Sequence, residues 1–245
     1  MKINNKPFLP GTDKQVSIFL RTVEIKNKSV LIFGTGCEEI AEIFHQNNAG
    51  EVYLITDNED SLFQARLALS AIKEINVRMM DYENTDFKAE RFDIIYSQGS
   101  TGTKKRNKII KEMKKILKPG GYFCVGEIVG LSQIPPQFVK DIWEKNDLAP
   151  LFNESFKEFY LSKGFELIVE EDLSDTLKDF YSISKRLLEE SSKEFSGKGS
   201  GSLRKLLKTY SHEANAYLKL GGDKYIGYEM LILKSISNLK SQISK

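Results

Sequence analysis

The first half of the chain alternates short apolar runs, rich in β-branched and aromatic residues, with amphipathic stretches at helical spacing. Such alternation is typical of strands joined by crossover helices, an arrangement that gives a parallel sheet with helices on both faces. The pattern predicts strands at residues 29–33, 51–56, 76–80, 92–97 and 122–127. It predicts helices at residues 39–46, 60–72 and 104–117, whereas the crossover 81–91 is too short for a full helix.

The pattern changes after residue 127, where longer helical stretches replace the strict alternation. Apolar positions at helical spacing predict helices at residues 137–145, 153–162, 176–194 and 203–220. Strands are predicted at residues 165–170 and 224–234, the latter after the Gly221-Gly222 turn. The segment SGKGSGS, residues 196–202, has the composition of a flexible surface loop.

Composition limits the class of protein. With 245 residues, 40% of them hydrophobic and 29% charged, the chain has the composition of an ordinary globular protein, and we expect a single domain over residues 1–245. Lys plus Arg number 36 against 34 Asp plus Glu, and a formal charge of +2 argues against a nucleic-acid partner. The local distribution is less even, because residues 104–118 are strongly basic and residues 154–190 strongly acidic. The basic stretch reads as the solvated face of a helix that packs on the sheet.

Targeting and metal-binding signals are weak in the sequence. No signal peptide or membrane-spanning run is evident, so we expect a cytoplasmic protein with no membrane partner. The spacing of two cysteines and two histidines assembles neither a disulfide framework nor a zinc site, and we expect no metal centre.

A buried strand runs into a glycine turn and then a helix in the segment VLIFGTGCEE, residues 30–39. Gly34 and Gly36 permit backbone conformations and a close ligand approach that a side chain would block, and the following helix presents unpaired amides. By itself this turn is compatible with dinucleotide-binding Rossmann proteins and with methyltransferases that use S-adenosylmethionine. Glu38 and Glu39 would repel a pyrophosphate at the helix N-terminus, whereas the cationic groups of S-adenosylmethionine tolerate them.

Four later segments favour the second family. FDIIYS at residues 92–97, a helix, LKPGG at 117–121 and the strand after it resemble the fourth-strand to fifth-strand region of class I S-adenosylmethionine-dependent methyltransferases. The resemblance covers residues 28–127. It implies an α/β fold, namely a Rossmann-like doubly wound, mostly parallel seven-stranded sheet with an antiparallel last strand and a helical cap.

The resemblance also implies S-adenosylmethionine as the cofactor and assigns residues to its parts by position. They are Gly34 and Gly36 for the methionyl part, Asp57 for the ribose, Asp81 and Tyr82 for the adenine, and Ser97 and Gln98 for the end of the pocket. Thr35 and Asn58, next to the glycines and to Asp57, are further candidates for cofactor binding. The chain departs from the family pattern at Ile32, where an acid is usual, at Glu38, where glycine is usual, and at Thr56, which displaces the ribose acid to the next position.

These departures keep two alternatives open. A degenerate methyltransferase fold could serve as a non-catalytic binding subunit. A NAD(P)-dependent oxidoreductase is the other alternative, which the two glutamates of the turn and the LKPGG segment disfavour.

Three segments are expected to form a cap over the site, namely residues 1–21, 128–152 and 173–220, because ligands bind beyond the carboxyl ends of parallel strands. Such a cap would enclose a small-molecule acceptor and exclude water, which suits methyl transfer by in-line displacement. The candidates for catalysis are Glu127 at the end of the fifth strand, and Tyr210 and His212 in the cap. A cationic amine is the favoured acceptor if the acidic stretch faces the pocket.

Overall fold

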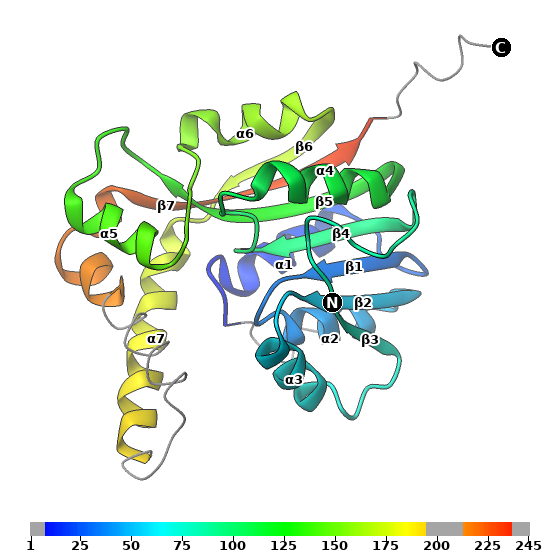
Figure 1. Ribbon diagram of the computed structural model, residues 1–245, viewed down its shortest axis with the longest axis horizontal. Coiled ribbons are helices and arrows are strands. Elements are labelled where there is room, and N and C mark those ends of the chain that lie inside the picture. Colours follow the sequence, from blue (N-terminus) through cyan, green and yellow to red (C-terminus); the bar gives the residue numbers. More distant parts are fainter. Residues whose placement is uncertain (1–7, 195–212, 237–245) are drawn as a thin grey trace.

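The protein is described by a computed structural model that covers residues 8–194 and 213–236 (Figure 1). Seven strands form one sheet: β1 (Ser29–Phe33), β2 (Glu51–Thr56), β3 (Ile75–Met79), β4 (Phe92–Gln98), β5 (Leu117–Gly130), β6 (Phe165–Asp172) and β7 (Ile226–Ser235). Their order across the sheet is β3-β2-β1-β4-β5-β7-β6. β7 runs antiparallel between β5 and β6, whereas the neighbouring pairs from β3 to β5 are parallel. The predicted sheet, including its antiparallel last strand, is confirmed.

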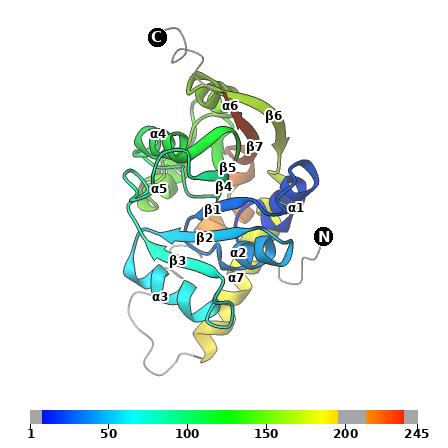
Figure 2. The ribbon, with the colours of Figure 1, turned by 90° about the vertical axis from the view of Figure 1, so that its right-hand side faces the viewer.

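Helices cover both faces of this sheet. They are α1 (Thr12–Thr22), α2 (Glu38–Gln46), α3 (Glu59–Ala68), α4 (Arg106–Ile116), α5 (Gln137–Lys145), α6 (Asn153–Ser162) and α7 (Asp175–Glu194), with a short 3-10 helix η1 (Gly222–Lys224). Residues 213–219 are also helical. Figure 2 shows α1 and α4 on opposite sides of the sheet.

Alternation along β1 explains the two layers of the core. Val30 and Ile32 face the layer that holds α1 and α2, whereas Leu31 and Phe33 face the layer that holds α4 and α6. All five residues of β1 are buried, because helices cover both faces of this central strand.

The predicted element boundaries differ from the structure in a few places. The helix expected at residues 60–72 ends at Ala68, and Asn58 caps it by accepting a hydrogen bond from the Ser61 amide at 2.9 Å. The fifth strand begins at Leu117 rather than at residue 122, so the LKPGG segment pairs with β4 at its first residue. The loop expected at residues 196–202 and most of the helix expected at 203–220 lie outside the described residues.

The crossover 81–91 has no helix, as predicted, and aromatic side chains cover the sheet there instead. Phe87 packs edge-on against Tyr53 and Phe92, with ring centroids 5.4 and 4.8 Å apart. Within residues 8–194 and 213–236, no helix is both long and apolar enough to span a membrane.

Candidate functional site

The chain reverses its winding direction at β1, which lies between β2 and β4. In such sheets a crevice opens beyond the carboxyl ends of the two diverging strands. The segment that follows β1 turns at Gly34 and Gly36, whose φ angles are 133° and 80°. A Cβ atom at Gly34 would lie 2.0 Å from Ser100 Oγ, and one at Gly36 would lie 3.3 Å from a methyl carbon of Leu9. The turn therefore requires glycine both for its conformation and for the closeness of the segments above it.

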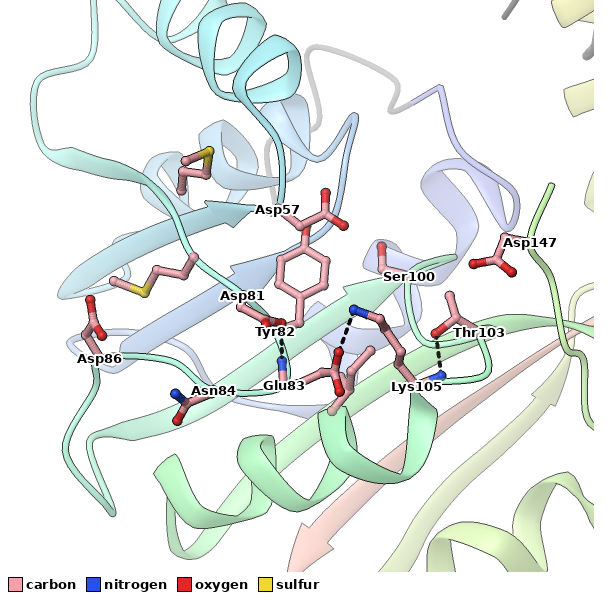
Figure 3. Close-up of a pocket in the computed structure, with 13 residues that line it drawn as sticks. Asp57, Asp81, Tyr82, Glu83, Asn84, Asp86, Ser100, Thr103, Lys105 and Asp147 are labelled. Carbon is pink, nitrogen blue, oxygen red and sulfur yellow. Dashed lines mark hydrogen bonds and ion pairs between the residues drawn. The ribbon is translucent and has the colours of Figure 1, made fainter.

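A pocket of about 670 Å³ lies next to this turn, within the usual size range of small-molecule sites (Figure 3). It is lined by Asp57, Met79, Met80, Asp81, Tyr82, Glu83, Asn84, Asp86, Ser100, Thr103, Lys105, Ile109 and Asp147. Three of the side chains predicted for the cofactor, Asp57, Asp81 and Tyr82, are thus brought together. Five carboxylates stand against one ammonium group among these residues, so the pocket is acidic.

Three hydroxyl groups at this end of the sheet are buried without a hydrogen-bond partner among the described residues. They belong to Thr56 at the end of β2, Tyr82 after β3 and Ser97 near the end of β4. The Tyr82 ring packs edge-on against Phe33, with centroids 5.3 Å apart. Burial raises the pKa of Tyr82, so its hydroxyl stays protonated and available as a donor. Unsatisfied buried polar groups of this kind are rare in proteins, and they fit a site that takes a polar ligand.

Two predicted cofactor residues form hydrogen bonds with residues next to the pocket. The Asn58 side chain caps α3 and donates a hydrogen bond to Asp57 Oδ1 at 2.9 Å. Thr35 Oγ1 lies 3.1 Å from Ser61 Oγ, which joins the glycine turn to the start of α3. Neither Asn58 nor Thr35 lines the pocket.

Gln98 has a different role from the one expected. Its Nε2 donates to the carbonyl oxygens of Pro10 and Thr12 at 2.8 and 3.0 Å, and its Oε1 accepts from the Tyr96 hydroxyl at 2.7 Å. Gln15 of α1 reinforces this connection by donating to the Ser97 carbonyl at 3.0 Å. The Gln98 side chain therefore fixes the segment before α1 and does not line the pocket.

Glu127 is buried beneath the loop that follows β4. Its Oε1 accepts hydrogen bonds from the Thr101 amide and hydroxyl, at 2.5 and 2.6 Å, and Thr101 Oγ1 also lies 3.0 Å from the Tyr160 hydroxyl. Burial raises the pKa of Glu127. The carboxyl group holds the loop that carries Ser100 and does not line the pocket. Tyr210 and His212, the other two catalytic candidates, lie outside the described residues.

Contacts join parts of the three segments expected to form a cap. Lys14 pairs with Asp175 of α7 at 2.9 Å, and the rings of Phe8 and Phe180 lie 5.2 Å apart. Glu213 accepts hydrogen bonds from Tyr181 at 2.6 Å and from Asn146 at 3.0 Å.

The pocket also contains residues that the sequence did not single out. Glu83 forms ion pairs with Lys105 and Lys108 at the start of α4, at 2.5 and 3.1 Å. Ser100 covers the glycine turn, and Asp147 comes from the connection between α5 and α6. Glu83 directly follows Tyr82 and Ser100 lies three residues beyond Ser97, so both are near predicted site residues, whereas Asp147 is not.

Comparisons with known proteins agree with this geometry. Residues 31–125 match the family model of the methyltransferase domain. No curated protein matches the chain in sequence.

Three solved structures share the fold. A candidate sarcosine dimethylglycine methyltransferase from Galdieria sulphuraria is 15% identical with a TM-score of 0.75, over 91% of this chain and 84% of that one. The cyclase SpnF is 20% identical with a TM-score of 0.73, over 91% and 80%. Phosphoethanolamine N-methyltransferase 2 from Haemonchus contortus, in complex with S-adenosyl-L-methionine, is 16% identical with a TM-score of 0.73, over 91% of this chain and about half, 52%, of that one. Residues 31–125 thus match the methyltransferase domain model, and the chain has the fold of class I S-adenosylmethionine-dependent methyltransferases.

Proposed function

We propose that the protein binds S-adenosylmethionine in the acidic pocket and transfers its methyl group to a small-molecule acceptor. The observation that carries this proposal is the acidic pocket beside the Gly34 turn. S-adenosylmethionine bears a sulfonium and an ammonium group, so carboxylates favour its binding. The same carboxylates repel a pyrophosphate, which argues against the NAD(P)-dependent alternative.

Residues of the chain suit each part of the cofactor. Asp57 is available to accept hydrogen bonds from the ribose hydroxyls, and Asp81 with Tyr82 flanks the place proposed for the adenine. We assign the methionyl part to the side of the pocket next to the glycine turn, where the hydroxyl groups of Thr56 and Ser97 are buried without a partner among the described residues. When bound, the cofactor supplies both the methyl group and a good leaving group. The protein then has to orient the acceptor in line with the methyl–sulfur bond and exclude water.

No described residue of the acidic stretch 154–190 lines this pocket, so the sequence-based reason for a cationic amine acceptor does not apply. We still favour a cationic amine, because the lining carboxylates outnumber the single lysine by four. Asp147 extends this acidic lining toward the segment between α5 and α6. Two of the proteins of similar fold are named as methyltransferases of amines, one a sarcosine dimethylglycine methyltransferase and the other a phosphoethanolamine N-methyltransferase.

Glu127 supports this reaction best as a positioning residue, because its carboxyl group binds Thr101 and is 2% exposed. Tyr210 and His212 remain candidates for proton transfer from the cap, if the acceptor nitrogen has to lose a proton.

A second candidate is a binding subunit without methyl transfer, or a related enzyme with another reaction. Ile32, at the position of the usual family acid, is fully buried in the core and offers the cofactor no charge. SpnF, which shares the fold, is named as a cyclase.

Isothermal titration with S-adenosylmethionine, S-adenosylhomocysteine and NAD distinguishes these candidates. We expect the first two to bind and NAD not to bind. A ligand at 100 times its dissociation constant adds about 2.7 kcal/mol to the free energy of unfolding, which a thermal melt detects. Binding of NAD alone would refute the proposal, and binding without methyl transfer to any of a panel of amines would favour the binding subunit.

A further inference from the structure

Glu83 is covered by two lysines at the edge of the pocket. Its carboxylate oxygens lie 2.5 Å from Lys105 Nζ and 3.1 Å from Lys108 Nζ. The Glu83 side chain is only 12% exposed, whereas those of Lys105 and Lys108 are 64% and 76% exposed. Hydrogen bonds from Lys105 and then Lys108 lower the pKa of Glu83, so it stays ionised.

Lys105 is the one cationic residue among the described residues that line the pocket. The hydrogen bond to Glu83 and the charge of Glu83 raise the pKa of Lys105, and the charges of Asp81 and Asp57 add to this effect. Its ammonium group therefore lies in the field of the same carboxylates that are proposed to attract the cofactor.

Local hydrogen bonds hold this ion pair in place. Asp81 Oδ1 accepts from the Glu83 amide at 2.9 Å, and Thr103 Oγ1 accepts from the Lys105 amide at 3.2 Å (Figure 3). Glu83 and Lys105 thus come from two loops that are each fixed by a side chain of the pocket. The pairing joins the segment after β3 to the start of α4 across the pocket.

We propose that Glu83 sets the charge selectivity of the pocket by neutralising Lys105, so that a cationic sulfonium nucleoside is preferred over its uncharged thioether. The inference rests on the proposed cofactor. Without Glu83, the Lys105 ammonium would stand unpaired beside the binding site and repel the sulfonium and ammonium groups of S-adenosylmethionine. A thioether nucleoside has an uncharged sulfur, so an unpaired Lys105 would not repel that sulfur and would not weaken the binding of this ligand.

The test is titration of the full chain and its Glu83→Gln variant with S-adenosylmethionine and with 5′-methylthioadenosine. We expect Glu83→Gln to raise the dissociation constant of S-adenosylmethionine about fivefold to tenfold. The dissociation constant of the neutral 5′-methylthioadenosine should stay unchanged. The effect on S-adenosylmethionine should shrink as salt is added, because salt screens charges at exposed sites.

Two further variants separate charge from a loss of structure. The double variant Glu83→Gln with Lys105→Gln removes the unpaired ammonium group that lines the pocket and leaves Lys108, which does not line it. We expect this variant to regain most of the affinity for S-adenosylmethionine. Glu170→Gln breaks a similar surface ion pair, with Lys157 at 2.8 Å, away from the pocket, and should leave both dissociation constants unchanged.

The outcomes distinguish this inference from the proposed function. If the unmodified protein binds S-adenosylmethionine and Glu83→Gln binds it equally well, the inference is overturned and the proposed function stands. Equal weakening for the charged and the neutral ligand, or no recovery in the double variant, also overturns it in favour of a structural role. If the unmodified protein binds neither ligand, the proposed function and the inference both fall.

Discussion

The side-chain amide of Gln98, at the end of β4, donates a hydrogen bond to the carbonyl oxygen of Pro10 at 2.8 Å. A second bond, to the Thr12 carbonyl, fixes the chain on both sides of Gly11. This connection places Leu9 over Gly36 and so joins the segment before α1 to the glycine turn.

Gln98→Leu should therefore destabilise the protein by about 1 to 3 kcal/mol, because it removes two hydrogen bonds to partly buried carbonyl groups and the Gln98 oxygen that accepts from the buried Tyr96 hydroxyl. Thermal melts measure this loss, and limited proteolysis should show faster cleavage within residues 8–15. Gln137→Leu, at an exposed glutamine that pairs with Asp141 on the surface of α5, is the matched control and should have little effect. A Gln98→Leu protein as stable as the control would contradict the role assigned to this side chain.

Replacing Gly34 by alanine should destabilise the protein more than the same change at a glycine that is constrained only by its backbone conformation. The new methyl group would meet Ser100 Oγ in addition to the strain at a φ of 133°. Gly120→Ala is the control, because Gly120 has a φ of 74° and no atom within 4 Å of an added Cβ. We expect Gly120→Ala to cost about 1 to 2 kcal/mol in a thermal melt, and Gly34→Ala to cost more and to abolish binding of S-adenosylmethionine. Equal losses of stability in Gly34→Ala and Gly120→Ala would show that the Ser100 side chain moves away from the added methyl group without cost.

Removing the charge of Glu127 should release the loop beneath which it is buried. An amide oxygen is a weaker acceptor than a carboxylate, so Glu127→Gln loosens the bonds to the Thr101 amide and hydroxyl. Hydrogen exchange of peptides that cover residues 99–103 should become faster. Glu213→Gln, at the buried carboxyl group of the cap, should leave this exchange unchanged. Unchanged exchange in Glu127→Gln would return Glu127 to the list of candidates for acid–base catalysis.

Glu229 should make stability depend on pH near neutrality. Burial, followed by the charges of Asp172 and Glu170, raises the pKa of Glu229 from 4.5 to about 7. A raised carboxyl pKa means that the protonated form is favoured in the folded state, so its contribution is complete below pH 4.5 and is lost as the pH rises through about 7. Because the group is partly exposed, we expect a difference of only a few tenths of a kcal/mol to about 1 kcal/mol.

The measurement is a series of thermal melts from pH 4 to pH 8 on Glu229→Gln. This variant should lose less stability than the unmodified protein as the pH rises. Glu171→Gln, on the opposite face of β6 by strand alternation, is the control and should follow the unmodified protein. Parallel pH curves for all three proteins would contradict the raised pKa.

The central strands could be predicted from the sequence because burial on both faces makes their residues mostly apolar. β1 is buried at all five positions, and its predicted boundaries are the observed ones. The edge strand β3 has one buried residue, Ile75, and three exposed ones, so its apolar signal is weak and its predicted position was one residue off. Asp57, Asp81 and Tyr82 could be predicted to lie together because they follow the ends of neighbouring parallel strands, which meet at one edge of the sheet.

Side chains that connect distant loops could not be predicted in this way. Glu83 and Lys105 belong to different loops, and charged surface residues have no periodicity that indicates a partner. The place of Gln98 at the end of β4 was predicted correctly, but its side chain follows the segment before α1. The path of that segment depends on packing across the whole sheet and leaves no local pattern in the sequence.

The crossover without a helix has a consequence for how this protein could acquire new specificities. Phe87 holds the crossover to Tyr53 and Phe92, while Asp81, Tyr82 and Glu83 form the pocket wall before it. The aromatic anchor and this part of the pocket wall are thus separate stretches of one loop. Because this stretch forms no helix of its own, its exposed positions outside the Glu83 ion pairs can vary during evolution or laboratory selection at little expense to folding.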